Sequence, residues 1–253
     1  MLKEIIIAIQ AYFQAHRFIK KHKLWKWILI PGILYAILFG VSMVLFFHAS
    51  ESLVATLILK TGLQNWLDKL QGSWLGFLFV IGGFVLMLIQ IILGFSLFKY
   101  FFLITGAPLF AYLSEKTEAI IEGNDFPFSV QQLAKDIIRG ISIAARNFIW
   151  QAVYALAILF ASLVPLVGLL TPVLALLVDC YFYGFSMLDY SLERHKKTTA
   201  ESILYISNHR GLAIGNGMVF YAMHLIPVVG WVLAPAYAVV AATLSMYPLK
   251  END

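Results

Sequence analysis

The stretches Pro165-Leu-Val-Gly168 and Pro227-Val-Val-Gly230 decide the fold, because each interrupts a long apolar run. A further proline follows each of them, at Pro172 and Pro235. Proline removes a helical hydrogen bond, and in lipid almost every backbone polar group must be bonded within its own segment. We therefore expect the runs 148–188 and 211–248 to form helical hairpins that enter the membrane, turn at a Pro-x-x-Gly tip and return.

The composition indicates the solvent in which this chain folds. Of its 253 residues, 61% are hydrophobic and 13% are charged, whereas about 25% of an ordinary globular domain is charged. The sequence thus predicts an all-α integral membrane protein, with residues 1–253 forming a single membrane domain. The one cysteine, Cys180, lies inside an apolar run, and the histidines lack the spacing of a metal pair. We expect no metal, no cofactor and no nucleic-acid partner.

Three further segments complete the predicted architecture. Residues 1–25 place apolar side chains at three- and four-residue spacing, which is typical of an amphipathic helix lying in the membrane interface. The apolar run 26–47 is long enough to cross a bilayer, and the run 74–105 exceeds one perpendicular crossing. We expect both runs to be long transmembrane helices.

Local signals predict shorter elements between these runs. Pro108 fits the first turn of a new helix, Gly123 fits a helix end, and Thr198 with Glu201 forms a capping box. These signals predict two short helices between residues 106 and 147, and one more short helix before the second hairpin.

The distribution of lysine and arginine predicts the topology. The N-terminal flank, the region 106–147 and the loop 189–210 are the basic segments, so all three should lie on the cytoplasmic side. Each broken run then begins and ends on the same side. Two full crossings with two half-penetrating hairpins satisfy this condition, and so do six full spans.

The densest positive cluster precedes the first transmembrane run. It contains Arg17, Lys20, Lys21, Lys23 and Lys26, with Trp25 and Trp27 among them. One interpretation is that the cluster sets the topology and contacts lipid phosphates. The other is an anion-receiving site at the start of a helix, where Lys23 and Lys26 would share a face.

Two carboxylates lie in or beside the first hairpin. Asp179 lies within an apolar arm, where a charged group marks either a solute pathway or a structural site near water. Asp189 closes that arm, and we expect it to pair with Arg194 or Arg210 and to fix the hairpin.

The stretch Asn208-His209-Arg210 precedes Gly215-Asn216-Gly217. This polar start of the second hairpin could offer backbone N–H groups to an anion, or its glycines could serve close helix packing.

Several stretches occur in an order that resembles a known family. They are Leu24-Trp25-Lys26-Trp27-Ile28-Leu29-Ile30-Pro31, Ala107-Pro108, Pro165-Leu-Val-Gly168, Asp189-Tyr190 with His195 nearby, Ile226-Pro227-Val-Val-Gly230, and Ala241-Ala242-Thr243. This ordered set, which covers nearly the whole chain, resembles the CysZ sulfate permeases. Etoposide-induced membrane proteins of eukaryotes share the domain.

The resemblance implies a fold and a function. It implies two long transmembrane helices, two half-penetrating hairpins and a homo-oligomer in the bacterial inner membrane. Such proteins pass sulfate inward for cysteine biosynthesis, and the chain contains no ATP-binding motif. The residues that would shape the pathway or the hairpins are Pro31, Pro165, Gly168, Pro172, Asp179, Asp189, Asn216, Pro227, Gly230 and Pro235.

One departure from the family pattern concerns the anion. The family motif near the first helix reads Gly-Leu-Arg, and this chain has Lys23-Leu24-Trp25-Lys26 instead. Lysine contacts an oxyanion as a point charge, whereas arginine holds it with two parallel hydrogen bonds. The predicted anion-binding residues are Lys23, Leu24, Trp25, Lys26 and Arg210.

Two other functional classes remain open. A scaffold that does not transport could recruit partners or anionic lipids through its basic amphipathic helices. A membrane enzyme is not motivated, because the sequence contains no phosphate-binding loop, nucleophile elbow or zinc-protease motif. We therefore expect an anion permease that is not an enzyme.

Overall fold

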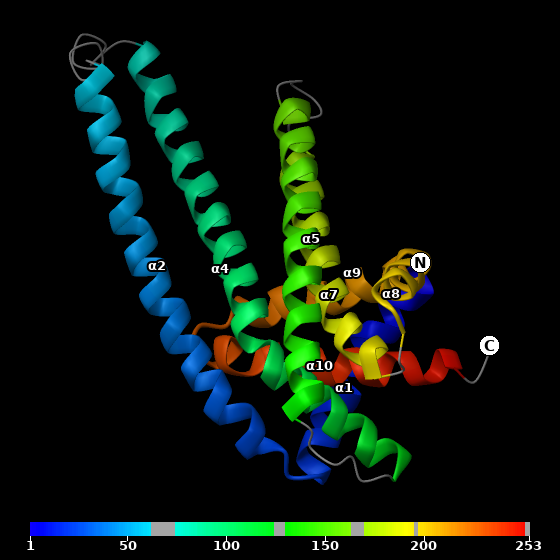
Figure 1. The fold of residues 1–253 in the computed structure, drawn as a ribbon. Helices are drawn as coiled ribbons and strands as arrows, with labels where there is room; N and C mark the ends of the chain where they lie inside the picture. Colours follow the sequence, from blue (N-terminus) through cyan, green and yellow to red (C-terminus); the bar gives the residue numbers. More distant parts are fainter. Residues whose placement is uncertain (62–73, 124–129, 163–169, 195–196, 251–253) are drawn as a thin grey trace. The chain divides into compact units, whose positions relative to one another are not determined.

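The computed structural model describes residues 1–61, 74–123, 130–162, 170–194 and 197–250. Within these residues every regular element is an α-helix, which confirms the predicted all-α fold. The helices are α1 (Leu2–Lys21), α2 (Trp25–Thr61), α4 (Trp74–Glu122), α5 (Val130–Ser162), α7 (Thr171–Arg194), α8 (Thr199–Asn208), α9 (Arg210–His224) and α10 (Val229–Lys250) (Figure 1).

Several helices are suited to a lipid environment. Among the described residues, four helical segments are long and apolar enough to cross a membrane, namely Trp25–Ser52, Ile137–Ile158, Thr171–Glu193 and Val229–Tyr247. Large apolar side chains of α5 and α7, including Ile149, Phe160 and Leu176, are exposed on the protein surface. Such a surface is stable only against lipid or another apolar partner. The chain is a multi-pass membrane protein.

The chain divides into two compact units. One comprises Met1–Ala36 together with Tyr100–Asp253, and the other comprises Ile37–Lys99. The second unit contains the later part of α2, which continues to Thr61, and the first part of α4. Within it, the rings of Phe39 and Phe98 meet edge to face with centroids 4.9 Å apart.

In the first unit, α7 and α9 pack with their backbones in contact. A Cβ on Gly184 would overlap the Ala213 carbonyl, and a Cβ on Gly217 would overlap the Cys180 carbonyl. Only glycine fits at these two points, as is common where helices approach closely in membranes. Helix α10 packs against both α7 and α9, and α1 packs against α9 and α10.

Helix α5 is continuous from Val130 to Ser162. The prediction of a separate short helix before residue 148 is therefore wrong. Gly140 is the weakest helix former between Arg139 and Phe148, and it is packed against α4, where its Cβ would lie 3.2 Å from the Ala107 side chain. Tertiary packing thus overrides the local signal.

The predicted helix start at Pro108 is also wrong, because α4 runs through this proline. Pro108 leaves the carbonyl of Ile104 without its helical donor. One residue earlier, the Leu103 carbonyl accepts a hydrogen bond of 3.1 Å from the Tyr190 hydroxyl of α7. This bond joins α4 to α7 beside the carbonyl that the proline frees.

Two predicted helix boundaries are confirmed. Gly123 follows α4 with a φ of 69°, a conformation that glycine adopts at little cost. Thr198 caps α8: its hydroxyl accepts from the Glu201 N–H at 3.3 Å, and the Glu201 carboxylate accepts from the Thr198 N–H at 2.7 Å. The side chain of each residue thus accepts a hydrogen bond from the backbone N–H of the other.

The second predicted hairpin contains a helix break at its centre. Helix α9 ends at His224 and α10 begins at Val229. The two helices run antiparallel, since the Asn216 side chain donates to the Ala238 carbonyl at 2.9 Å while Gly230 packs on the Met223 carbonyl. With 15 residues, α9 is about 22 Å long, shorter than a hydrocarbon core of roughly 30 Å.

The first predicted hairpin is only partly described. Its tip, with Pro165 and Gly168, lies outside the described residues. Pro172 is the second residue of α7, where a missing N–H costs no helical hydrogen bond. The two arms α5 and α7 run antiparallel, and Asn147 donates to the Ser186 hydroxyl at 3.2 Å.

Candidate anion-binding site

The corner between α1 and α2 is built by a Schellman motif. The Leu24 N–H donates to the Ile19 carbonyl at 3.1 Å, and the Lys23 N–H donates to the Lys20 carbonyl at 3.4 Å. Lys23 has a φ of 53°. This is the left-handed position that glycine most often occupies at a helix end, and here it is a lysine.

The residues between the two lysines anchor the corner. Leu24 and Ile19 are buried, which is the apolar contact that commonly accompanies the motif. Trp25 is half-buried and lies edge to face with His16 at 6.4 Å, and His16 Nδ1 is hydrogen-bonded to the Tyr237 hydroxyl at 2.8 Å. The geometry gives Leu24 and Trp25 a structural place in the corner.

Lys23 and Lys26 carry the charge of this corner. Both side chains are exposed, and neither forms an ion pair within the described part of the chain. They lie at the N-terminus of α2, where the helix dipole adds roughly half a positive charge. The corner can therefore attract an anion.

Arg210 lies far from this corner. It is the first residue of α9, its side chain is exposed, and its Nε donates to the Ser207 carbonyl at 2.9 Å. The next residue, Gly211, packs against Glu4 at the start of α1. Lys23 follows the C-terminal end of α1, whereas Glu4 lies near its N-terminal end. The 20 residues of α1 span about 30 Å. The structure does not bring Arg210 together with Lys23.

The start of α9 already holds a carboxylate. Glu4 accepts from the Gly211 N–H at 3.0 Å and forms a 2.9 Å hydrogen bond with His209 Nδ1. The amide that could have received a free anion is thus bonded to Glu4. The neighbouring Gly215 packs against α1, where its Cβ would lie 2.8 Å from the Ala8 side chain. The packing interpretation of these glycines agrees with this geometry.

Asn216 is buried among three helices. Its side-chain amide donates to the Ala238 carbonyl of α10, and its backbone carbonyl accepts a 2.9 Å hydrogen bond from the Tyr12 hydroxyl of α1. Burial raises the pKa of Tyr12 well above its ordinary value, so the hydroxyl stays a neutral donor. These contacts tie α1, α9 and α10 together.

Asp179 belongs to a polar chain across three helices. The Tyr100 hydroxyl of α4 donates to Gln151 Oε1 of α5 at 2.5 Å, and Gln151 Nε2 in turn donates to Asp179 of α7. Asp179 is half-buried. Its carboxylate therefore has protein donors inside an apolar segment, as a buried charge requires.

Asp189 pairs with Arg139, so the expected pairing with Arg210 is wrong, whereas the side chain of Arg194, the other expected partner, lies outside the described part of the chain. Arg139 Nη2 donates to Asp189 Oδ1 at 2.7 Å and Nε donates to Oδ2 at 3.2 Å, which is a bidentate pair. The reason is that antiparallel pairing of α5 with α7 sets residues of distant sequence opposite each other. Arg139 also donates to the Ser202 hydroxyl at 2.7 Å and to the Lys197 carbonyl.

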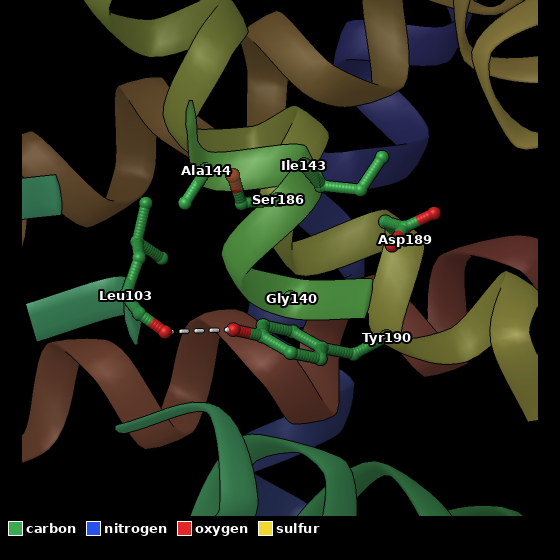
Figure 2. A pocket seen from close by; sticks show the side chains of 7 residues that line it. All are labelled: Leu103, Gly140, Ile143, Ala144, Ser186, Asp189 and Tyr190. Atoms are coloured by element: carbon green, nitrogen blue, oxygen red, sulfur yellow. Dashed lines mark hydrogen bonds between the residues drawn. The ribbon is translucent and has the colours of Figure 1, made fainter. Parts of the chain in front are cut away.

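This ion pair borders a small hollow between α4, α5 and α7. Figure 2 shows the hollow with Gly140 and Ser186 on its walls and with the Tyr190 hydroxyl bonded to the Leu103 carbonyl. The hollow has no room for a water molecule. Asp189 is a bonded structural residue in this geometry, and sequence reasoning missed Arg139 because no local pattern links the two.

The tip of the second hairpin is strained and exposed. The Val229 N–H donates to the Pro227 carbonyl at 2.7 Å around Val228, whose φ is 62°. Such a γ-turn is rare, and a positive φ is costly for a β-branched residue. Leu225 is 83% exposed and Val228 is 61% exposed. The tip therefore presents apolar side chains away from the protein.

Two further prolines of the predicted pathway set lie within helices. Pro31 lies in α2 and Pro235 lies in α10. Pro235 lines an apolar hollow of about 10 Å³ with Gly32, Tyr35 and Val232, room for roughly one water molecule. Among the described residues, no group of three His, Cys, Asp or Glu side chains is placed to hold a metal ion.

Comparison with known proteins identifies the family. The family described as "Sulfate transporter CysZ/Etoposide-induced protein 2.4" matches residues 11–235. The chain belongs to this family. The match begins within α1 and extends through both Pro-x-x-Gly stretches to Pro235, and it includes the Lys23–Lys26 corner.

Individual members of the CysZ family are similar over most of their length. The protein named "Sulfate transporter CysZ" from Pseudomonas paraeruginosa is 32% identical over 227 residues, which cover 87% of this chain and 89% of the relative. A namesake from Pseudomonas aeruginosa is 31% identical over the same shares. One from Pseudomonas syringae pv. tomato is 29% identical over 72% of this chain and 73% of the relative. CysZ proteins are transporters, so the expectation that this chain is not an enzyme is confirmed.

Proposed function

We propose that this protein is an anion permease that admits sulfate through the inner membrane of a bacterium for cysteine biosynthesis. One observation carries the proposal: a protein named as a sulfate transporter is 32% identical and is covered over 89% of its length. The chain contains no ATP-binding motif, so we propose that the anion's own gradient, coupled ions or internal consumption drives uptake.

In this proposal the corner between α1 and α2 receives the anion. Lys23 and Lys26 are exposed and form no ion pair within the described residues. Two charges beside a helix N-terminus raise the local concentration of an anion, and this effect weakens with added salt. Lysine binds the oxyanion as a point charge, and we therefore expect looser selection than an arginine fork would give.

The second hairpin would form a half-penetrating wall of the passage. Helix α9, at 15 residues, is shorter than the roughly 30 Å hydrocarbon core that a crossing helix must span. The break at residues 225–228 lets α10 return beside α9. A homo-oligomer would enclose the water that such a wall requires, since irregular backbone in a membrane must face protein or water.

The two carboxylates of the first hairpin would act as structural residues. Asp189 is paired with Arg139, and Asp179 accepts from Gln151. A carboxylate on the path would repel the permeant anion, whereas one that is bonded across helices holds the wall together. We propose that both residues fix the helices beside the passage.

Uptake into liposomes tests the proposal. Purified protein is reconstituted without ATP, and uptake of labelled sulfate down an inward sulfate gradient is followed, with chloride and phosphate as competitors. The expected result is saturable sulfate uptake that chloride competes with poorly. Absence of any saturable anion uptake would remove the permease and favour the scaffold.

A further inference from the structure

We infer that Lys116 is a further ligand of the permeant oxyanion. It is a third lysine, which α4 brings to the corner of Lys23 and Lys26. The inference rests on the proposed function, because it assigns this lysine to the same anion-receiving site. Ninety residues of sequence separate Lys116 from Lys26, and only the fold places them near one another.

Aromatic side chains hold the Lys116 ammonium in place. Its Nζ lies 5.1 Å from the centroid of the Trp27 ring and 5.6 Å from that of Tyr112. It also donates a hydrogen bond of 3.4 Å to the Tyr112 hydroxyl. Cation–π contacts of this kind orient an ammonium without neutralising its charge. Trp27 directly follows Lys26 in the first turn of α2, so the contact fixes Lys116 beside the corner.

The charge of Lys116 remains available to a ligand. Lys116 makes no ion pair within the part of the chain that the structure describes. An ammonium has three N–H donors, and the hydrogen bond to Tyr112 uses one of them. The other two can reach an oxygen of a tetrahedral anion such as sulfate.

Two of the three acidic residues in this stretch of α4, Glu118 and Glu122, lie on a different face from Lys116. Glu118 and Glu122 are four residues apart, and the Tyr247 hydroxyl of α10 donates to Glu122 at 3.0 Å. Lys116 is two residues from Glu118, about 200° away around the helix. The helix thus directs Glu122 to α10 and Lys116 to Trp27 of α2, so this carboxylate lies away from the proposed anion.

A half-buried lysine between a tryptophan and a tyrosine could also hold a lipid phosphate, which has the same tetrahedral oxygens. We favour the permeant anion over a lipid phosphate as the ligand, because Trp27 connects Lys116 to Lys26 and Lys23. The charges of these two lysines have no ion-pair partner among the described residues. Trp27 is 44% exposed, so its ring can report an anion that binds beside Lys116.

Fluorine NMR tests the inference directly. The six tryptophans are replaced biosynthetically by 5-fluorotryptophan, and Trp27→Phe identifies the resonance of position 27. The protein is placed in phosphatidylcholine nanodiscs and titrated with sodium sulfate, with sodium chloride at equal ionic strength as the control. Lys116→Gln is compared with Lys116→Arg, which keeps the charge. It is also compared with Lys135→Gln, which removes the charge of an exposed lysine of α5.

Sulfate, but not chloride, should shift the Trp27 resonance in wild type, in Lys116→Arg and in Lys135→Gln. In Lys116→Gln the apparent affinity should fall about tenfold, the usual effect of losing a hydrogen bond to a charged group. Equal affinities in Lys116→Gln and Lys135→Gln would overturn the inference. A shift caused only by phosphatidylglycerol in the disc would also overturn it and reassign the lysine to lipid.

The test separates this inference from the proposed function. If liposomes show no sulfate uptake but sulfate shifts the Trp27 resonance in a Lys116-dependent manner, the binding site is supported and the permease function is refuted. If uptake is normal and the resonance of Trp27 does not move, the inference about Lys116 falls alone.

Discussion

Replacing Lys23 by glycine separates the charge of the anion-binding corner from its backbone. Lys23 has a φ of 53° and is exposed, so the substitution removes a charge and a backbone strain without opening a cavity. Lys23→Ala removes the same charge but keeps the strain. The difference between the two variants therefore reports the backbone alone.

The expected magnitude follows from the left-handed conformation. An L-residue in this region costs about 1–2 kcal/mol, from which glycine is exempt. Glycine loses about 0.4–1 kcal/mol of this gain through its greater freedom in the unfolded chain. Lys23→Gly should exceed Lys23→Ala by about 0.5–1 kcal/mol, which for a chain of this size is a difference in Tm of roughly 1–4 °C. The hydrogen bonds of Lys23 and Leu24 to α1 are unchanged in both variants.

The chain offers its own reporter for this measurement. Cys180 is the single cysteine and is buried, so a thiol-reactive fluorophore labels it only after unfolding. Thermal labelling in detergent gives the Tm of each variant, and sulfate uptake into liposomes gives its activity. Both variants should lose uptake to the same degree, because both lack the charge.

Two results would refute this reasoning. Equal Tm values for Lys23→Gly and Lys23→Ala would show that the corner is not strained at this residue. Full uptake by Lys23→Gly, with loss in Lys23→Ala, would show that the anion depends on the backbone of the corner and not on the lysine charge.

Three further predictions concern the helix contacts. Arg139→Ala should lower stability by about 3–5 kcal/mol, because it leaves the buried Asp189 carboxylate without its partner; Arg139→Lys should cost less, and thermal labelling of Cys180 measures both. Gly217→Ala should destabilise by about 1–3 kcal/mol because its Cβ would overlap a carbonyl of α7. Gly40→Ala, whose Cβ would meet nothing within 4 Å, should be neutral or stabilising by up to about 1 kcal/mol. Equal changes of stability in Gly217→Ala and Gly40→Ala would contradict the packing argument. Hydrogen bonds from Thr198 hold the pKa of Glu201 below its ordinary 4.5. The cap is therefore complete above pH 4.5, and it is lost as the pH falls through the lowered pKa of Glu201. The protection factors of the α8 amides, which correct for the intrinsic pH dependence of hydrogen exchange, should fall in acid in wild type, and Glu201→Gln should abolish that acid-dependent step.

Features that depend on a few neighbouring residues could be predicted from the sequence. The capping box of Thr198 and Glu201 and the helix end at Gly123 involve residues within one turn of each other. The break after His224 follows from Pro227, which lacks an N–H donor. The apolar runs likewise predicted the class of fold, because the lipid imposes helices on any chain of this composition.

Features that depend on contacts between distant helices could not be predicted. Asp189 pairs with Arg139 rather than with a residue nearby in sequence, since α5 opposes α7. Pro108 does not start a helix, since α4 runs through it and is bonded to α7 beside it. These outcomes are set by tertiary structure, which a single sequence does not display.

The candidate site was predicted only in part. Lys23 and Lys26 were identified from charge and spacing, and the structure places them at one exposed corner. Arg210 was grouped with them but lies at the opposite end of α1. Lys116 went unnoticed because a single lysine between acidic residues carries no local signal, and only its contact with Trp27 reveals it.

The most direct measurement is labelled sulfate uptake into liposomes by wild type, by Lys23→Gln with Lys26→Gln, and by Lys20→Gln with Lys21→Gln as a charge-matched control. We expect saturable uptake by wild type and by the control pair, and uptake at least about tenfold lower in the Lys23 and Lys26 variant. Saturable uptake that is unchanged in that variant, or no saturable uptake by wild type at all, would contradict this expectation.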